Sequence, residues 1–136
     1  MDRVTLRTWG EAYEQAWRTS GTEGLDTLFA EDATYQTAPF EDPFRGLAAI
    51  SAMWEEERSG PDEAFALRSE VVAVEGDTGV VRVEVRYGEP ASQTYRNLWI
   101  VRLSDEGRCT TFEEWPFWPP GSEGEFAKGP PEYGDR

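Results

Sequence analysis

The sequence predicts a single α+β domain in which a curved antiparallel sheet packs against three N-terminal helices. The chain has 136 residues, which is the length of one domain. Large apolar residues recur at helical spacing in its first part, whereas from about residue 65 they alternate with polar residues as they do in strands. Helices followed by a run of strands with short turns are typical of α+β domains. A long sheet curves when helices back it, and the curvature leaves room for a cavity.

The first helix is expected over residues 6–17, because the large apolar residues of this segment share one face. Residues 8–11 have the S/T-x-x-E form of a capping box near the start of the helix, and Gly21 is a suitable C-terminal stop. The residues of the apolar face are Leu6, Trp9, Tyr13 and Trp17.

Two further helices are expected before the main strands begin. A short helix begins at Thr22, and a strand over residues 32–37 follows it. The segment 38–46 contains two prolines and a glycine, so it is expected to be a loop. The third helix follows this loop and ends at residues 59–61. The inward-facing residues of the two helices are Leu25, Leu28 and Phe29, and then Leu47, Ile50, Met53 and Trp54.

The second half of the chain has the period of β-strands. The alternation is clearest from Val81 to Tyr87, where every second residue is Arg or Glu. From Pro119 the chain is rich in proline and glycine, so we expect a folded domain over residues 1–118 and a tail over residues 119–136. The expected strands cover about 65–74, 81–87, 93–103 and 108–117, with turns at 75–79 and 104–107.

Composition and charge exclude several classes of function. The formal net charge is −14, with 27 acidic residues against 13 basic ones. This charge repels phosphate backbones and anionic lipid surfaces, so neither nucleic acid nor a membrane is an expected partner. The chain has no histidine and a single cysteine, Cys109, which excludes a Ser-His-Asp or Cys-His catalytic group and a His/Cys zinc site. We therefore expect no metal and no cofactor.

The chain also lacks the signals of a membrane or secreted protein. No stretch approaches the length of a membrane span, and residues 1–4 lack the apolar run of a signal peptide. The expected location is the cytoplasm.

Several segments resemble the sequence pattern of a known superfamily. Residues 28–35 read LFAEDATY and are followed by Gly46 and Ile50, which resembles the "LFAEDATY … G…AI" signature of nuclear transport factor 2-like proteins. The turn at 105–108 and the strand segment 112–115 resemble the SnoaL-like branch of that superfamily. The resemblance covers about residues 5–118. It implies a cone-shaped domain in which the helices cover the concave face of the sheet and enclose a pocket.

The resemblance does not fix the reaction, because the superfamily includes polyketide cyclases, ketosteroid isomerases, scytalone dehydratases, epoxide hydrolases and pockets without assigned activity. Similarity to ketosteroid isomerases puts Tyr13 at the position of their oxyanion-hole tyrosine. It puts Thr37 where they have the proton-abstracting aspartate, and threonine cannot serve as that base. It puts Trp99 where they have the protonated, hydrogen-bond-donating aspartate, and tryptophan offers only an indole N–H there. Scytalone dehydratases use histidine, which this chain lacks. Neither chemistry is expected here.

The alternation of side chains along the last two strands predicts which residues face the pocket. On strand 93–103 they are Tyr95, Asn97, Trp99, Val101 and Leu103, and on the last strand Thr110, Phe112, Glu114 and Pro116. Six Trp, five Tyr and seven Phe suit an apolar lining for a flat hydrophobic or aromatic ligand, although any single ring is more often part of the core than a ligand contact. The expected ligand-binding residues are Trp17, Tyr35, Phe40, Phe44, Trp54, Tyr87, Trp99 and Phe112.

Glu114 is the expected catalytic residue. In an aromatic cavity, loss of hydration would raise the pKa of its carboxyl group towards neutrality, which suits general acid–base catalysis. SnoaL-like cyclases are similar in placing an acid on this late strand. Tyr13 and Asn97 would polarise or orient the ligand. In the alternative interpretation, Glu114 is a structural carboxylate tied to Tyr13, Asn97 or a backbone donor, or it points outward while Glu113 points inward.

The opposite face of the sheet carries apolar residues that the helices do not cover. It carries Leu98, Ile100, Trp115 and Phe117, which need a cover. We expect a sheet-to-sheet homodimer, with the C-terminal tail folding back as the alternative.

The favoured function is a pocket that binds a small hydrophobic molecule and supports cofactor-independent cyclase, dehydratase or isomerase chemistry. A ligand-binding module without turnover, or a protein-interaction module that uses this sheet face, is the alternative.

Overall fold

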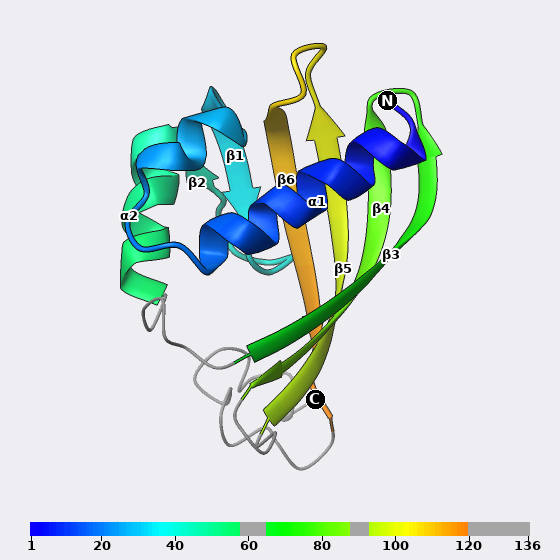
Figure 1. Ribbon diagram of the computed structural model, residues 1–136. Helices are drawn as coiled ribbons and strands as arrows, with labels where there is room; N and C mark the ends of the chain where they lie inside the picture. The colour runs from blue at the N-terminus through cyan, green and yellow to red at the C-terminus, as the bar shows by residue number, and fades with distance from the viewer. Residues whose placement is uncertain (58–64, 88–92, 120–136) are drawn as a thin grey trace.

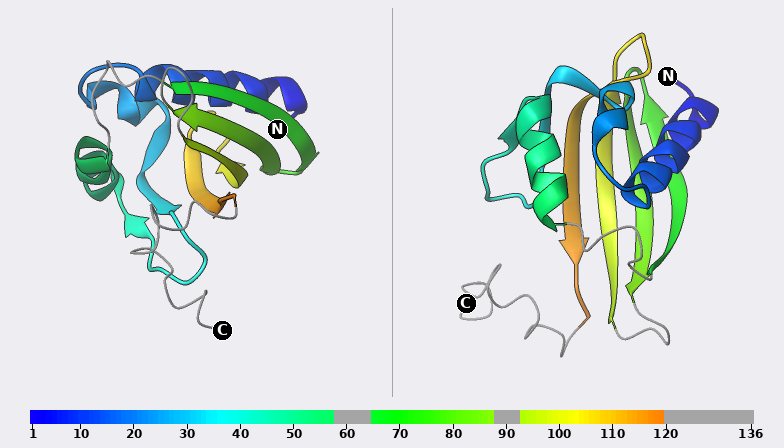
Figure 2. Two further views of the ribbon diagram at one scale, coloured as in Figure 1. Left: turned by 90° about the horizontal axis from the view of Figure 1, so that it is seen from below. Right: turned by 60° about the vertical axis from the view of Figure 1, so that its left-hand side comes forward.

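The computed structural model describes residues 1–57, 65–87 and 93–119. Within these residues, two α-helices and a short 3-10 helix pack against one face of a curved sheet, which confirms the predicted α+β class (Figures 1 and 2). The helices are α1 (Arg3–Trp17), the 3-10 helix η1 (Glu23–Thr27) and α2 (Leu47–Glu57). The strands are β1 (Phe29–Gln36), β2 (Phe44–Arg45), β3 (Phe65–Glu75), β4 (Thr78–Tyr87), β5 (Gln93–Leu103) and β6 (Cys109–Phe117).

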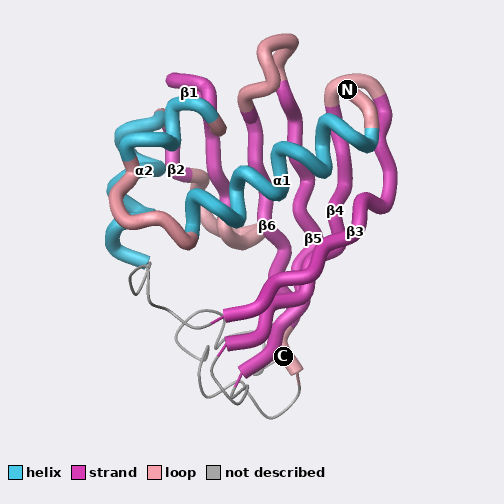
Figure 3. Tube along the Cα trace, in the orientation of Figure 1, coloured by secondary structure: helices cyan, strands magenta, loops and turns pink. Residues whose placement is uncertain are grey.

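The described strands form one six-stranded sheet in the order β2-β1-β6-β5-β4-β3. Neighbouring strands are antiparallel except for β1 and β6, which run parallel. Helix α1 lies diagonally across the sheet, and α2 lies beside β1 and β2 (Figure 3). The parallel pair was not predicted, because strand alternation does not reveal a strand's partner. It places Tyr35 of β1 beside Phe112 of β6, at the centre of the domain.

Helix α1 begins earlier than the predicted capping box. The Asp2 carboxylate accepts a hydrogen bond from the backbone N–H of Thr5 at 2.8 Å, so Asp2 caps the helix and residues 8–11 lie inside it. The predicted apolar face is confirmed, since Leu6, Trp9 and Tyr13 are buried. Leu6 packs on Gly79 of β4, where an added Cβ atom would collide with the Leu6 side chain. Glycine at this position therefore lets α1 lie close to the sheet.

The second predicted helix is only the five-residue 3-10 helix η1, and Phe29 begins strand β1 instead. The carbonyl of Leu28 accepts a hydrogen bond from the backbone N–H of Cys109 at 2.7 Å. The backbone at this point therefore pairs with β6 and cannot continue a helix. An apolar pair such as Leu28 and Phe29 fits a buried strand as well as a helix face, which is why spacing alone misassigned it.

Aromatic side chains fill the space between the helices and the sheet. Trp54 of α2 and Phe112 of β6 are both 0% exposed. The Phe112 ring stacks against Tyr13 and Tyr35, with centroid distances of 5.4 and 4.6 Å. These contacts hold the rings from three elements in fixed positions, so the surface that they present is largely preformed.

The other face of the sheet carries the predicted apolar residues. Leu98 and Ile100 are partly buried there, whereas Trp115 and Phe117 are 37% and 56% exposed. None of the described helices is long and apolar enough to cross a membrane. The predicted C-terminal tail falls almost entirely on residues 120–136, which lie outside the described residues, so it stays a prediction.

Candidate functional site

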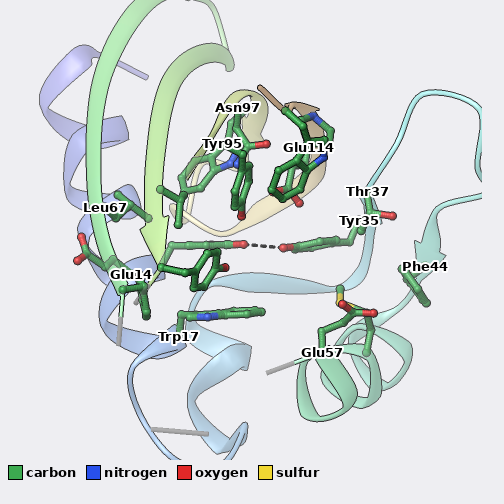
Figure 4. A pocket seen from close by; sticks show the side chains of 18 of the residues that line it. Glu14, Trp17, Tyr35, Thr37, Phe44, Glu57, Leu67, Tyr95, Asn97 and Glu114 are labelled. Atoms are coloured by element: carbon green, nitrogen blue, oxygen red, sulfur yellow. Dashed lines mark hydrogen bonds between the residues drawn. The ribbon is translucent and has the colours of Figure 1, made fainter. Parts of the chain in front are cut away.

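A cavity of about 500 Å³ lies between the helices and the sheet (Figure 4). Side chains from α1, β1, α2 and strands β3 to β6 line it, so every layer of the domain contributes. Nine of the described lining residues are aromatic. The cavity is therefore large enough for a small organic molecule and is shaped mainly by ring faces.

Alternating residues of β5 and β6 form one wall of the cavity. Asn97 is 2% exposed and faces it, as does Trp99, which confirms the predicted orientation of β5. Glu114 lies opposite Trp99 in the β5–β6 register and is therefore a diagonal neighbour of Asn97 on the same face. Glu113 accepts a hydrogen bond from the indole N–H of Trp115 at 3.1 Å. Of the two glutamates, Glu114 is the one that lines the cavity.

The environment of Glu114 changes its acidity. Loss of hydration raises the pKa of Glu114 from its ordinary value of 4.5 to about 7. Hydrogen bonding by the Asn97 side chain lowers this pKa, and the negative charge of Glu57 on α2 raises it. The side chain of Glu114 is only partly buried, so solvent or a ligand in the cavity can reach it. A carboxyl group that titrates near neutral pH can both donate and accept a proton.

Neutral tyrosine hydroxyl groups lie near Glu114 on three elements. The hydroxyl groups of Tyr13 and Tyr35 hydrogen-bond to each other at 2.5 Å, which is the dashed line in Figure 4. Burial raises the pKa of Tyr13, Tyr35 and Tyr95 well above 10.0, and the nearby charge of Glu114 adds to the effect. These phenols therefore keep their protons at neutral pH and serve as uncharged hydrogen-bond donors.

Two buried polar atoms of the cavity wall have no hydrogen-bond partner among the described residues. They are Oδ1 of Asn97 and Nε1 of Trp99. A buried acceptor or donor without a partner costs about 1–3 kcal/mol, so such atoms call for a partner from outside the chain. They mark where a ligand can make directed contacts.

Carboxylates also line the mouth of the cavity. Glu14 forms an ion pair with Arg18 at 2.7 Å, and the Arg18 guanidinium lies 3.9 Å from the centre of the Phe65 ring. Glu41 and Glu57 are exposed and form no ion pair within the described part of the chain. No group of three His, Cys, Asp or Glu side chains among the described residues is placed to hold a metal ion.

Most of the residues predicted from the sequence meet at this cavity. All three predicted catalytic residues, Glu114, Tyr13 and Asn97, line it. Their catalytic roles remain proposals. The predicted ligand-binding residues that line it are Trp17, Tyr35, Phe44, Tyr87 and Trp99.

Three predicted ligand-binding residues lie elsewhere. Phe40 is 84% exposed, because it lies in a loop whose sequence has no period to indicate its direction. Trp54 and Phe112 face inward as predicted, yet they are completely buried and are not part of the lining. Tyr13 packs against both rings and itself lines the cavity, so Trp54 and Phe112 form a supporting layer.

A β-bulge corrects one further prediction. The register of β5 and β6 shifts between Arg102 and Leu103, which pair with Thr111 and Cys109. Thr110 is the extra residue of the bulge. The inward position that alternation predicted for Thr110 is taken by Cys109, which is buried. A bulge reverses the parity of a strand locally, and the sequence carries no sign of it.

Several lining residues were not predicted from the sequence. Glu14 is three positions before Trp17, so helical spacing could have placed it at the cavity. Leu67 pairs with Val85 across β3 and β4, but the strand pairing had to be known before both could be assigned to one wall. The other missed residues are Thr37, Glu41, Glu57, Phe65 and Trp118.

Comparison with known proteins agrees with this architecture. A family model described as a SnoaL-like domain matches residues 10–112. A protein of the SnoaL-like family from Agrobacterium tumefaciens superposes with a TM-score of 0.67 at 20% identity, over 84% of this chain and 98% of that one. The same search of structures finds the epoxide hydrolase/cyclase-like enzyme SalBIII, which has a role in pyran ring formation in the polyether salinomycin. It has a TM-score of 0.67 at 13% identity, over 85% of this chain and 93% of that one.

A computationally designed 17-OHP binder has a TM-score of 0.62 at 14% identity, over 82% of this chain and 91% of that one. At these identities the superpositions show a shared fold. A sequence search among curated proteins finds no match.

Proposed function

The chain belongs to the SnoaL-like domain family, and on this premise we propose that it binds a small hydrophobic or aromatic molecule and moves a proton on it through Glu114. The reaction is of the cyclase, dehydratase or isomerase class. Acid–base chemistry of this kind needs a group that titrates near the working pH, oriented hydrogen-bond donors and a cavity that holds the ligand against them.

The observation that carries the proposal is the position of Glu114. Its carboxyl group lines an aromatic cavity, and desolvation raises its pKa to about 7. Proton transfer is most efficient when the pKa of the catalytic group lies near the working pH. Glu114 would therefore take a proton from a carbon or hydroxyl group of the ligand and return it at another atom.

Tyr13 and Asn97 have supporting roles in this proposal. The Tyr13 phenol keeps its proton at neutral pH, so it can stabilise negative charge that develops on a ligand oxygen. Asn97 contacts Glu114 and leaves its own Oδ1 unpartnered, which suits a group that orients both the carboxyl group and the ligand. SalBIII and the designed 17-OHP binder share this fold, and each of them acts on or binds a small organic molecule.

Hydrogen–deuterium exchange tests the proposal without knowledge of the natural ligand. The probe is 2-acetylnaphthalene, a flat ketone whose methyl hydrogens exchange slowly in D₂O. The wild-type protein is expected to accelerate this exchange, as followed by NMR, and Glu114→Gln should lower the rate by about 100-fold or more. Glu113→Gln is the matched control, because Glu113 does not line the cavity, and it should exchange like the wild type.

Equal exchange by the wild type and Glu114→Gln would remove the catalytic role of Glu114. Binding of the ketone to the wild type without exchange would favour the alternative, a binding module without turnover.

The exposed sheet face supports a second, structural proposal. Trp115 and Phe117 are exposed apolar side chains that alternate along β6 with the cavity-lining residues Glu114 and Pro116, so they lie on the other face of the sheet. The described helices do not cover that face (Figure 2). We propose that two copies of the chain cover this face in a homodimer. Light scattering at micromolar concentration should give twice the mass of one chain, and a monomeric mass would contradict the dimer. The interaction-module alternative predicts instead that this face binds a different protein.

A further inference from the structure

We infer that the cavity selects an organic cation, namely a hydrophobic or aromatic amine whose ammonium group is held between the Glu114 carboxylate and Oδ1 of Asn97. The inference depends on the proposed function in one respect, because it assumes that this cavity binds a small molecule. It adds the chemical class of that molecule.

The charges around the cavity favour a cation. Glu41, Glu57 and Glu114 line it without an ion pair among the described residues, and no described Lys or Arg belongs to the lining. Arg18 is close to the mouth, but its charge is offset by the ion pair with Glu14. The net charge of the whole chain is −14, so the potential in a cleft of this protein attracts cations and repels carboxylates and phosphates.

The rings of the lining offer faces on which a cation can bind. Tyr95 stacks against Tyr87 at a centroid distance of 6.0 Å, and both line the cavity with Trp17 and Trp99. The negative face of an aromatic ring attracts an ammonium or guanidinium group. The protein already uses this contact at the mouth, where the Arg18 guanidinium lies 3.9 Å from the centre of the Phe65 ring.

Hydrogen bonding gives the second, independent argument. Asn97 is 2% exposed, and its side chain lowers the pKa of Glu114, as an amide N–H group directed at a carboxylate does. Its Oδ1 atom has no partner among the described residues and lies in the cavity wall. Oδ1 and the neighbouring Glu114 carboxylate are both acceptors. A primary ammonium group carries three N–H donors on one atom and can satisfy both.

Several groups from different elements face Glu114, and only one of them changes charge near neutral pH. Tyr13, Tyr35 and Tyr95 have raised pKa values and stay neutral, and the negative charge of Glu57 raises the pKa of Glu114. Glu114 itself, whose pKa is raised to about 7, gains its charge as the pH rises through that value. An ammonium ligand should therefore bind more tightly at pH 8 than at pH 6, whereas the affinity of a neutral analogue should not increase over this range.

Three probes with the same aromatic ring test the inference: 2-naphthylmethylamine, 2-naphthylmethanol and 2-naphthoate. Calorimetric titration of the full chain at pH 8 should give an affinity for the amine about tenfold higher than for the alcohol, and lowest affinity for the carboxylate. In Glu114→Gln, the affinity for the amine should fall to within about threefold of the affinity for the alcohol. Glu57→Gln should weaken binding of the amine more than Glu56→Gln does. Both substitutions remove one charge from α2, but only Glu57 lines the cavity.

The pH series on the wild type provides a test that does not depend on any variant folding. The ratio of the amine and alcohol affinities should rise between pH 6 and pH 8. An alcohol that binds as tightly as the amine, or a ratio that does not change with pH, would overturn the inference and leave the proposed cavity function intact. If none of the three probes binds, both the inference and the proposed function are wrong.

Discussion

Replacement of Glu114 by glutamine is expected to make the protein more stable above neutral pH, because the native state holds this carboxyl group in a poorly hydrated site. In the unfolded chain the group titrates near its ordinary pKa of 4.5, whereas in the folded protein desolvation raises that pKa to about 7. Between these two values the native state binds more protons than the unfolded state. The free energy of unfolding of the wild type therefore falls as the pH rises through this window.

The size of the effect follows from the shift in pKa. A rise from 4.5 to about 7 corresponds to about 3 kcal/mol of unfolding free energy, which is fully present below the lower value and lost above the upper one. Glu114 is only partly buried, so solvent reduces the loss, and we expect about 2 kcal/mol between about pH 5 and pH 8. Glutamine has nearly the same shape and does not titrate, so Glu114→Gln should lack this component.

Urea denaturation measures the difference directly. The six tryptophans of the chain give a fluorescence signal for unfolding, and both proteins are measured at about pH 5 and pH 8. Glu113→Gln is the control, since it removes a neighbouring carboxylate that does not line the cavity, and it should keep the pH dependence of the wild type. If the wild type and Glu114→Gln lose the same free energy over this range, the carboxyl group is not desolvated and the reasoning about its acidity fails.

Other substitutions test the packing that shapes the cavity. Trp54→Ala removes a completely buried ring and should cost about 3–5 kcal/mol in urea unfolding, and a cost below about 1 kcal/mol would contradict the burial of this side chain. Tyr13→Phe deletes the hydroxyl group that bonds to Tyr35 and should cost about 1 kcal/mol, visible as a lower thermal midpoint; an unchanged midpoint would mean that this bond adds no net stability. Gly79→Ala places a methyl group against Leu6 and should cost about 1–3 kcal/mol by overpacking, so a neutral effect in chemical denaturation would show that α1 can move away from β4.

The parts of the site that lie on regular strands could be predicted from the sequence. Tyr95, Asn97 and Trp99 occupy alternate positions of β5, and all three line the cavity. Glu114 follows the same rule on β6, because the bulge lies before it in the strand. Alternation is a local property of an extended backbone, so a single strand is enough to fix which face a side chain takes.

The parts that depend on tertiary structure could not be predicted. Alternation gives the direction of a side chain but not its depth, so Trp54 and Phe112 were assigned to the lining although they lie behind it. The apolar pair at residues 28 and 29 fits a helix and a strand equally well, and only the pairing with Cys109 of β6 decides between them. Phe40 lies in a loop, where no period exists to indicate its exposure.

The most direct test of the central claim is the titration of Glu114 itself. Carboxyl carbon NMR of the ligand-free protein follows each glutamate from pH 3 to pH 9, and the spectrum of Glu114→Gln identifies the resonance of Glu114. The midpoint is predicted near pH 7, because the aromatic cavity removes water from the carboxylate. A midpoint near 4.5 would contradict both the desolvated site and the acid–base role that depends on it.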